Sequence, residues 1–214
     1  MVGPNGAGKS TLARLLLGLY PATSGVMRVG GSPLDSLDPL RREAWWRACT
    51  AVFQDFTQYH LTARENIGFG DLAAPERVEA AAAAGDAAVV IDALPDRYDT
   101  TLGPTFGGRD LSGGQWQRLA GSRGCMAQAP LVVLDEPTAA LDPLAELAVY
   151  ERFTRLTAGR TALLISHRLA SARQCDRIIV LDGGRLVEEG THEALMAAGG
   201  LYFRLFTAQA QCYR

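Results

Sequence analysis

The sequence predicts an α/β fold, in which a mostly parallel β-sheet carries helices and a helical lobe is inserted into the chain. At the start of the chain, a glycine-rich turn precedes an apolar pattern of helical spacing. Further on, continuous apolar runs end in polar residues, as is typical of strands covered on both faces. Between residues 56 and 109 the composition changes to an Ala-rich pattern, which predicts the inserted lobe.

The glycine-rich turn has the pattern G-x-x-x-x-G-K-[ST] of a phosphate-binding loop. Its glycines allow successive backbone N–H groups to point at one anion, and Lys9 adds a positive charge. Apolar residues at helical spacing follow, so a bound phosphate would lie at a helix N-terminus, with the Ser10 hydroxyl offered to Mg²⁺. The candidate phosphate-binding residues are Gly3, Pro4, Asn5, Gly6, Ala7, Gly8, Lys9, Ser10 and Thr11.

A glycine-rich turn can also precede a helix by chance, and the composition of the chain argues against that alternative. The chain contains 20 Arg and one Lys, and the one Lys is Lys9. A compact ammonium fits a narrow loop better than a planar guanidinium does. The single lysine therefore favours the phosphate-binding interpretation.

Bulk properties exclude several classes of protein. With 214 residues, 48% of them hydrophobic, the chain is long enough for one core with an inserted lobe. A formal net charge of −2 gives no electrostatic footprint for nucleic acid, so we expect no nucleic-acid partner. The four cysteines are widely spaced, which favours a reducing compartment without a zinc site. No apolar run reaches the length of a membrane span.

A second helix start able to bind an anion is expected at Leu111–Gln115. Ser112 is a natural N-cap, and Gly113 and Gly114 expose backbone N–H groups in the first turn. One phosphate needs only one such helix end. The sequence therefore predicts a second phosphate site, or one site shared by two helix ends.

The apolar run 131–134 predicts a buried strand that ends in two carboxylates, Asp135 and Glu136. An acidic helix cap is the alternative, and Pro137 disfavours it. Two further strands are expected to end in polar side chains, 50–53 before Gln54 and 161–165 before Ser166 and His167. The other expected elements are a strand at 25–31, helices at 39–47, 76–94 and 143–156, a hairpin at 177–188 and tail helices at 191–196 and 201–209.

Together these motifs resemble the nucleotide-binding domain of ATP-binding cassette proteins, and the match runs from Gly3 to about Gln209. The Leu111–Gln115 string is similar to the family signature, which is more specific than a phosphate-binding loop. The resemblance implies ATP hydrolysis, with ATP and Mg²⁺ as the cofactors.

The resemblance also implies the domain organisation. Residues 1–214 would form a single ATPase domain of the P-loop NTPase (RecA-like) type. Its core would comprise residues 1–55 and 128–214, and residues 56–127 would form the helical subdomain that carries the signature.

Roles for individual residues follow from the resemblance and agree with their chemistry. Lys9 and the loop amides would hold the β- and γ-phosphates, and His167 would contact the γ-phosphate. Glu136 would act as the base that orients the attacking water. The implied Mg²⁺ ligands are Ser10, Gln54 and, through water, Asp135.

A second nucleotide-binding domain is the first implied partner. In a head-to-tail dimer, the signature of one copy would complete the ATP site of the other, which would explain the second helix start. The two copies could be identical or different. The residues implied in this role are Ser112, Gly113, Gly114, Gln115 and, at the joint, Asp142.

The tail and the segment Leu61–Ile67 look most like the exporter branch of the family, whose cassettes are commonly fused behind a transmembrane domain. The implied function is therefore an ATPase that powers export, held at the cytoplasmic face of the cell membrane by a transmembrane domain. Two alternatives stay open. One is a soluble cassette ATPase acting in translation or DNA maintenance, and the other is a truncated, inactive cassette.

Three departures from the family pattern carry expectations of their own. Only Met1 and Val2 precede Gly3, so we expect either a start further upstream or a fold without most of the strand before the loop. The family also holds adenine with an aromatic residue upstream of the loop and a small β-subdomain, and we expect the given sequence to contain neither. Gly121 and Gly124 lie within the helix expected after the signature, each at a cost of about 1 kcal/mol relative to Ala.

Overall fold

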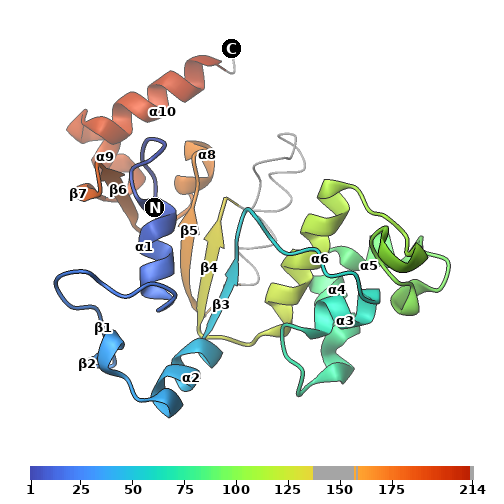
Figure 1. Cartoon of the computed structure of the whole chain (residues 1–214). Coiled ribbons are helices and arrows are strands. Elements are labelled where there is room, and N and C mark those ends of the chain that lie inside the picture. Colours follow the sequence, from blue (N-terminus) through green and yellow to red (C-terminus); the bar gives the residue numbers. More distant parts are fainter. Residues whose placement is uncertain (137–156, 158, 213–214) are drawn as a thin grey trace. The chain divides into compact units, whose positions relative to one another are not determined.

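A computed structural model describes residues 1–136, 157 and 159–212, which divide into two compact units, each described by itself below. The first unit consists of Met1–Trp46, Val133–Glu136 and the described residues from Leu163 onward, and the second of Arg47–Val132 and the described part of 137–162. The elements are α1 (Lys9–Leu16), β1 (Arg28–Val29), β2 (Ser32–Pro33), η1 (Leu34–Ser36), α2 (Pro39–Arg47), β3 (Cys49–Val52), α3 (Ala63–Gly68), η2 (Pro75–Arg77), α4 (Val78–Ala84), α5 (Ala87–Asp92), η3 (Arg97–Asp99), η4 (Thr105–Gly107), α6 (Gly113–Met126), β4 (Leu131–Asp135), β5 (Thr161–Ile165), α8 (Leu169–Ala172), β6 (Ile178–Asp182), β7 (Arg185–Gly190), α9 (His192–Ala198) and α10 (Leu201–Cys212), where η denotes a 3₁₀ helix (Figure 1).

The strands β3, β4 and β5 form one sheet in that order. Near the start of β4, the Thr161 N–H donates to the Pro130 carbonyl at 2.9 Å, and just past its end the Glu136 N–H donates to the Ile165 carbonyl at 3.0 Å. Starts pair with starts and ends with ends, so β4 and β5 run parallel. The central strand β4 is buried over residues 132–135, as its apolar run predicted.

The two residues that precede the glycine-rich loop take the place of a strand between β5 and β6. Met1 accepts the Ser166 N–H at 3.2 Å on one side. On the other side, the Val2 N–H donates to Ile179 and the Val2 carbonyl accepts from Leu181, both at 2.9 Å. The strand that the loop needs in front of it is therefore represented by these two residues.

The C-terminal part of the first unit is a hairpin with two helices against it. β6 and β7 pair antiparallel, and the turn places Gly183 and Gly184 at φ angles of 52° and 76°, so the predicted hairpin is confirmed. Figure 1 shows α9 and α10 beside this hairpin. The apolar cluster under them consists of Val2, Leu169, Ala172, Ile178, Val180, Leu195 and Tyr202.

The helix α2 is attached to α1 through two indole groups. Asp38 caps its start, since the Asp38 carboxylate accepts the Arg41 N–H at 2.9 Å. The Trp45 and Trp46 N–H groups donate to carbonyls at the end of α1, at 3.2 and 3.1 Å respectively. These bonds satisfy two of the carbonyls that a helix end leaves free.

In the second unit α3, α4, α5 and α6 form a helical cluster (Figure 1). The prediction of one Ala-rich helix over 76–94 is wrong, because the chain breaks into α4 and α5 at Gly85 and Asp86. A Cβ on Gly85 would lie 2.1 Å from the Ser122 hydroxyl of α6, and Asp86 has a φ angle of 61°. Close packing on α6 therefore interrupts the helix, and the small side chains Ala81 and Ala82 are buried there.

The glycines within α6 do not interrupt it, since the helix is continuous from Gly113 to Met126. A Cβ on Gly124 would lie 2.9 Å from a Val52 methyl of β3, whereas a Cβ on Gly121 would meet nothing within 4 Å. Close packing accounts for Gly124. Nothing in the structure explains Gly121.

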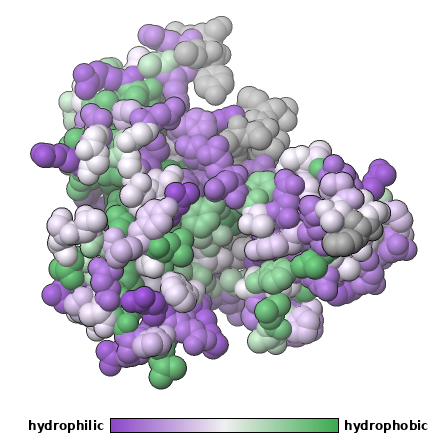
Figure 2. All heavy atoms as spheres, viewed as in Figure 1, coloured by the Kyte–Doolittle hydropathy of each residue, from purple (hydrophilic) through white to green (hydrophobic). Residues whose placement is uncertain are grey.

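Hydrophilic residues and smaller apolar areas alternate on the face shown in Figure 2. Several large apolar side chains of the second unit are exposed, including Phe69, Leu72 and Val89. Within the described ranges, we find no helix with both the length and the apolar character that a membrane span requires.

Candidate functional site

The loop before α1 has the backbone of a phosphate-binding turn. Gly3, Gly6 and Gly8 have φ angles of 150°, 78° and 92°, which residues other than glycine rarely adopt. Gly8 is the N-cap of α1, and no side chain caps the helix. The N–H groups of the first turn of α1 are therefore left without a side-chain acceptor, as a helix start that binds an anion requires.

The backbone of the β6–β7 hairpin contacts this loop at two points. A Cβ on Gly3 would lie 2.1 Å from the Leu181 carbonyl oxygen, so no side chain fits there. The Gly184 N–H of the hairpin turn donates to the Ala7 carbonyl at 3.2 Å. These contacts with the β6–β7 hairpin thus hold the loop in its conformation.

The Lys9 side chain points back into the loop. It is only 6% exposed, and its ammonium donates to the carbonyl oxygens of Gly3 and Pro4 at 2.9 and 3.0 Å. The positive charge of the loop is therefore held at its centre, within the turn that the glycines form.

Two carboxylates follow one another at the end of β4. Asp135 is 4% exposed, and Glu136 lies one residue beyond the strand. Glu136 has a φ angle of 50°, in the left-handed region, which costs a non-glycine residue of order 1–3 kcal/mol. This turn points the Glu136 side chain away from the strand and towards the segment that follows β5.

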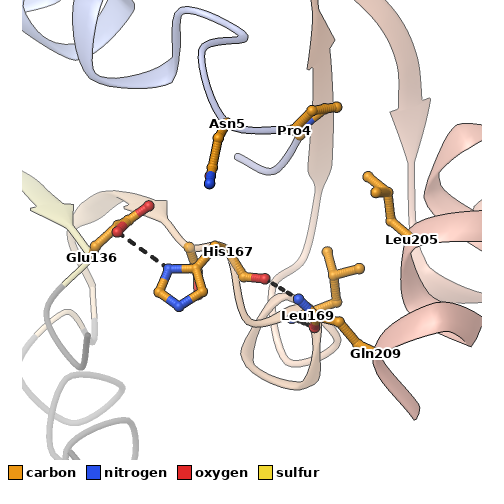
Figure 3. Close-up of a pocket in the computed structure, with 9 residues that line it drawn as sticks. Pro4, Asn5, Glu136, His167, Leu169, Leu205 and Gln209 are labelled. Atoms are coloured by element: carbon orange, nitrogen blue, oxygen red, sulfur yellow. Dashed lines mark hydrogen bonds and ion pairs between the residues drawn. The ribbon is translucent and has the colours of Figure 1, made fainter. Parts of the chain in front are cut away.

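Glu136 meets the imidazole of His167, which comes two residues after β5. The His167 Nδ1 atom lies 3.2 Å from the Glu136 carboxylate (Figure 3). A pocket of about 420 Å³ adjoins this pair and is lined by the first residues of the phosphate loop. Its lining residues are Gly3, Pro4, Asn5, Glu136, Ser166, His167, Leu169, Leu205 and Gln209.

The Glu136 contact bears on what the His167 ring can do. When Nδ1 donates to the carboxylate, Nε2 is an acceptor in the neutral ring and a donor in the protonated one. His167 could therefore donate to a phosphate from Nε2 only when the ring carries both protons.

Ser10 and Asp135 offer a hydroxyl and a carboxylate, both in the first unit. Oxygen atoms of these kinds are the ligands that Mg²⁺ prefers. The donor set present therefore fits the predicted metal. Gln54, the third predicted ligand, is exposed after β3 in the second unit, and its role stays a prediction.

The start of α6 lies in the second unit and has the predicted N-cap. The Ser112 hydroxyl accepts the Gln115 N–H at 3.4 Å, and the Gln115 side chain accepts the Ser112 N–H at 2.8 Å. This reciprocal pair is a capping box, and Ser112 and Gly113 are exposed. Asp142, the other predicted residue of this group, lies outside the described residues.

The segment after Gln54 is held by two residues of the second unit. Asn66 is fully buried, and its side-chain amide donates to the carbonyls of Tyr59, Leu61 and Thr62. Arg123 of α6 donates to the Asn66 carbonyl at 2.9 Å and lies over the Tyr59 ring, and burial lowers the pKa of its guanidinium. Asn66 is thus a structural residue.

One polar residue at the pocket was missed from the sequence. Gln209 of α10 lines the pocket, and its amide contacts the backbone around His167 (Figure 3). Gln209 stands in an alternation of Ala and Gln with no motif around it. No local sequence signal could have identified it.

Comparisons with known proteins agree with these observations. The family model described as "ABC transporter" matches residues 1–139. The chain is 44% identical over 207 residues to the mycobactin import ATP-binding/permease protein IrtA of Mycobacterium tuberculosis (strain ATCC 25618 / H37Rv), covering 96% of this chain and 23% of that protein. It is 40% identical over 210 residues to the subtilin transport ATP-binding protein SpaT of Bacillus subtilis, covering 96% of this chain and 34% of that protein.

Among solved structures, a bacterial Atm1-family ABC exporter with ATP bound matches with a TM-score of 0.87 and 36% sequence identity. That match covers 98% of this chain and 36% of the exporter chain. The predicted α/β fold, a mostly parallel sheet with an inserted helical subdomain, is thereby confirmed. The chain spans between 23% and 36% of the length of these three proteins.

Proposed function

Because the chain belongs to the ABC transporter family, as its motifs predicted, we propose that it is the ATP-hydrolysing nucleotide-binding part of an exporter-type transporter. The observation that carries this proposal is the pocket in which the start of the phosphate loop lies beside Glu136 and His167 (Figure 3). A glycine-rich anion-binding turn, a carboxylate and an imidazole around one pocket are the groups that phosphoryl transfer to water requires.

In the proposed reaction, the loop amides and Lys9 hold the β- and γ-phosphates of ATP. Ser10, Gln54 and, through water, Asp135 would hold Mg²⁺, which would supply positive charge to the phosphate oxygens. Glu136 accepts a hydrogen bond from the attacking water and orients it towards the γ-phosphorus. His167 holds the γ-phosphate from Nε2 while Nδ1 stays on Glu136.

The dimer is part of the proposal. The capped end of α6 is exposed, and a Cβ added to Gly113 or Gly114 would meet no atom within 4 Å. A second copy would place the nucleotide that is bound at its own phosphate loop against this end of α6. Ser112–Gln115 and Asp142 would then complete the ATP site of that second copy. Removal of the γ-phosphate by hydrolysis would then let the two copies part.

The membrane partner is proposed on two grounds. The IrtA relative is a combined ATP-binding and permease protein, and this chain spans only 23% of it. In addition, Leu72 is 76% exposed and Phe69 is 45% exposed in the second unit. Apolar side chains left in water are suited to contact with a transmembrane domain at the cytoplasmic face of the membrane.

Replacement of the proposed base tests the reaction. Glu136→Gln keeps the size of the side chain and removes its ability to accept a proton from water. We expect kcat for ATP hydrolysis to fall by at least about 100-fold, since general-base contributions are of that order. ATP affinity should be retained, because the loop and Lys9 are unchanged.

The matched control is Glu76→Gln, an exposed carboxylate of η2, which should leave turnover unchanged. Light scattering of Glu136→Gln with saturating ATP should show a stable dimer, because ATP binds and is not consumed. Undiminished hydrolysis in Glu136→Gln would exclude Glu136 as the base. A monomer under these conditions would contradict the shared site.

A further inference from the structure

The side-chain amide of Gln209 binds the backbone on both sides of Arg168. Its Nε2 donates to the His167 carbonyl, and its Oε1 accepts the Leu169 N–H at 2.8 Å. Figure 3 shows this side chain reaching the His167 segment from α10. One amide therefore satisfies both the carbonyl group of His167 and the N–H group of Leu169, the first residue of α8.

The rest of this segment is tied internally by hydroxyl groups. The Ser166 Oγ atom accepts the Arg168 N–H at 3.0 Å, and the Ser171 Oγ atom donates to the Arg168 carbonyl at 2.5 Å. These bonds give the turn its own shape. The Gln209 amide is a hydrogen-bonded contact between this turn and α10, in addition to the packing of Leu169 and Ala172 in the cluster that contains Tyr202.

The helix α10 is itself firmly placed at its start. The Glu188 carboxylate of β7 accepts the N–H groups of Leu201 and Tyr202, the latter at 3.0 Å. Tyr202 is fully buried, and its hydroxyl lies 2.8 Å from the His192 Nδ1 atom. Gln209 follows Tyr202 by seven residues, which is two helical turns along nearly the same face. The contacts at the start of α10 therefore hold in place the helix that carries the Gln209 side chain.

We propose that Gln209 is a positioning residue, which holds the backbone at His167 so that the imidazole stays on Glu136 at the pocket. The expected effect of Gln209 on kcat rests on the proposed ATP hydrolysis. The expected effect on the position of the His167 ring rests on the geometry alone. An amide supplies from one side chain both the donor and the acceptor that the two backbone groups need, whereas a carboxylate lacks the donor and an ammonium lacks the acceptor. The chemistry of the site therefore suits the amide of Gln209.

The first experiment compares Gln209→Ala with Gln211→Ala, an exposed glutamine two residues further along the same helix. In Gln209→Ala we expect kcat to fall about 10- to 100-fold, as displacement of a group at the reacting phosphate does. ATP affinity, measured by titration with a fluorescent ATP analogue, should stay within about twofold, since the loop is unchanged. Gln211→Ala should leave both quantities unchanged. A fall in affinity that matches the fall in kcat would overturn the positioning role.

A double-mutant cycle separates positioning from general support of the fold. In a His167→Ala background, Gln209→Ala should have no further effect on kcat, because the ring that it positions is gone. An equal fall in both backgrounds would contradict the proposal. Gln209→Glu keeps the size of the side chain and the acceptor for Leu169 and loses the donor for His167, so it should show an intermediate rate even if Gln209→Ala is poorly folded.

A third readout does not depend on hydrolysis. In NMR spectra, the ring signals of His167 should shift in Gln209→Ala and stay in place in Gln211→Ala, with His60 of the second unit as an internal reference. Unchanged His167 signals would overturn the proposal. A wild-type protein without ATPase activity, in which Gln209→Ala still moves the His167 signals, would contradict the proposed function and leave the positioning role supported.

Discussion

The two glycine-rich helix starts of this protein, those of α1 and α6, differ in how their first N–H groups are satisfied. Gly8 precedes α1 in a left-handed conformation, and no side chain caps that helix. Ser112 precedes α6 and forms a reciprocal capping box with Gln115. The first start carries the buried Lys9, whereas Ser112 at the second is exposed.

This difference separates a helix start built around a ligand from one that keeps its own shape. The N–H groups at the start of α1 have no side-chain acceptor, so surrounding backbone, such as that of Leu181 and Gly184, has to hold the loop in place. The start of α6 satisfies the N–H groups of Ser112 and Gln115 with its own side chains and can be exposed without losing its conformation. We therefore expect α1 to bind phosphate within one copy and α6 to act on a nucleotide that another copy presents.

The largest effect is expected from removing the charge at the first start. Lys9→Ala should lower ATP affinity by about 100-fold, because a hydrogen bond to a charged group contributes roughly 1.5–3 kcal/mol and the ammonium can reach more than one phosphate. Ser112→Ala should leave the affinity of a single copy within about twofold and lower the rate of the dimer. Calorimetric titration with ATP at low protein concentration measures the two affinities, and a steady-state ATPase assay measures the rate. Equal losses of affinity in the two variants would remove the distinction between the two helix starts.

A smaller effect, on stability, is expected from adding a methyl group at each start. Gly3→Ala should lower the free energy of unfolding by about 2 kcal/mol, since the added Cβ would collide with the Leu181 carbonyl at an unfavourable φ angle. Gly113→Ala has open space around it and should change stability by less than about 1 kcal/mol. Urea unfolding compares the two. If Gly3→Ala left the stability unchanged and Gly113→Ala lowered it, the start of α6, and not the loop before α1, would be the more closely packed of the two.

The smallest effect is expected further along α6. Gly121→Ala should raise the free energy of unfolding by about 0.5–1 kcal/mol, because alanine is the better helix former and the site is open. Gly124→Ala should bring no such gain, since its Cβ would press on Val52. Melting temperatures of the two variants test this contrast. A stabilising Gly124→Ala would show that β3 and α6 pack less tightly there than the geometry indicates.

Much of the fold was predictable because its signals are local. The phosphate loop, the apolar run of β4 and the glycine turn of the hairpin each depend on residues adjacent in sequence. The caps at Asp38 and Ser112 were predictable for the same reason, since a cap acts within one turn of the helix. The expected roles of Gln54 and Asp142 stay predictions.

Other features depended on contacts between distant residues. The break between α4 and α5 follows from Ser122 pressing on Gly85, which no pattern in 76–94 indicates. The left-handed backbone of Glu136 and its contact with His167 likewise require β4 and β5 to lie side by side. Gln209 reaches His167 across 42 residues of chain.

By itself, the sequence determined which groups could bind a phosphate or act on it. A Gly-rich turn, a lysine and carboxylates at the end of a strand have that chemistry wherever they lie in the fold. Only the tertiary structure decided which of them share one pocket and which side chain from the tail supports them. The reason is physical: chemical type is a property of each residue, whereas proximity is created by parallel strand pairing and helix docking between segments far apart in the chain.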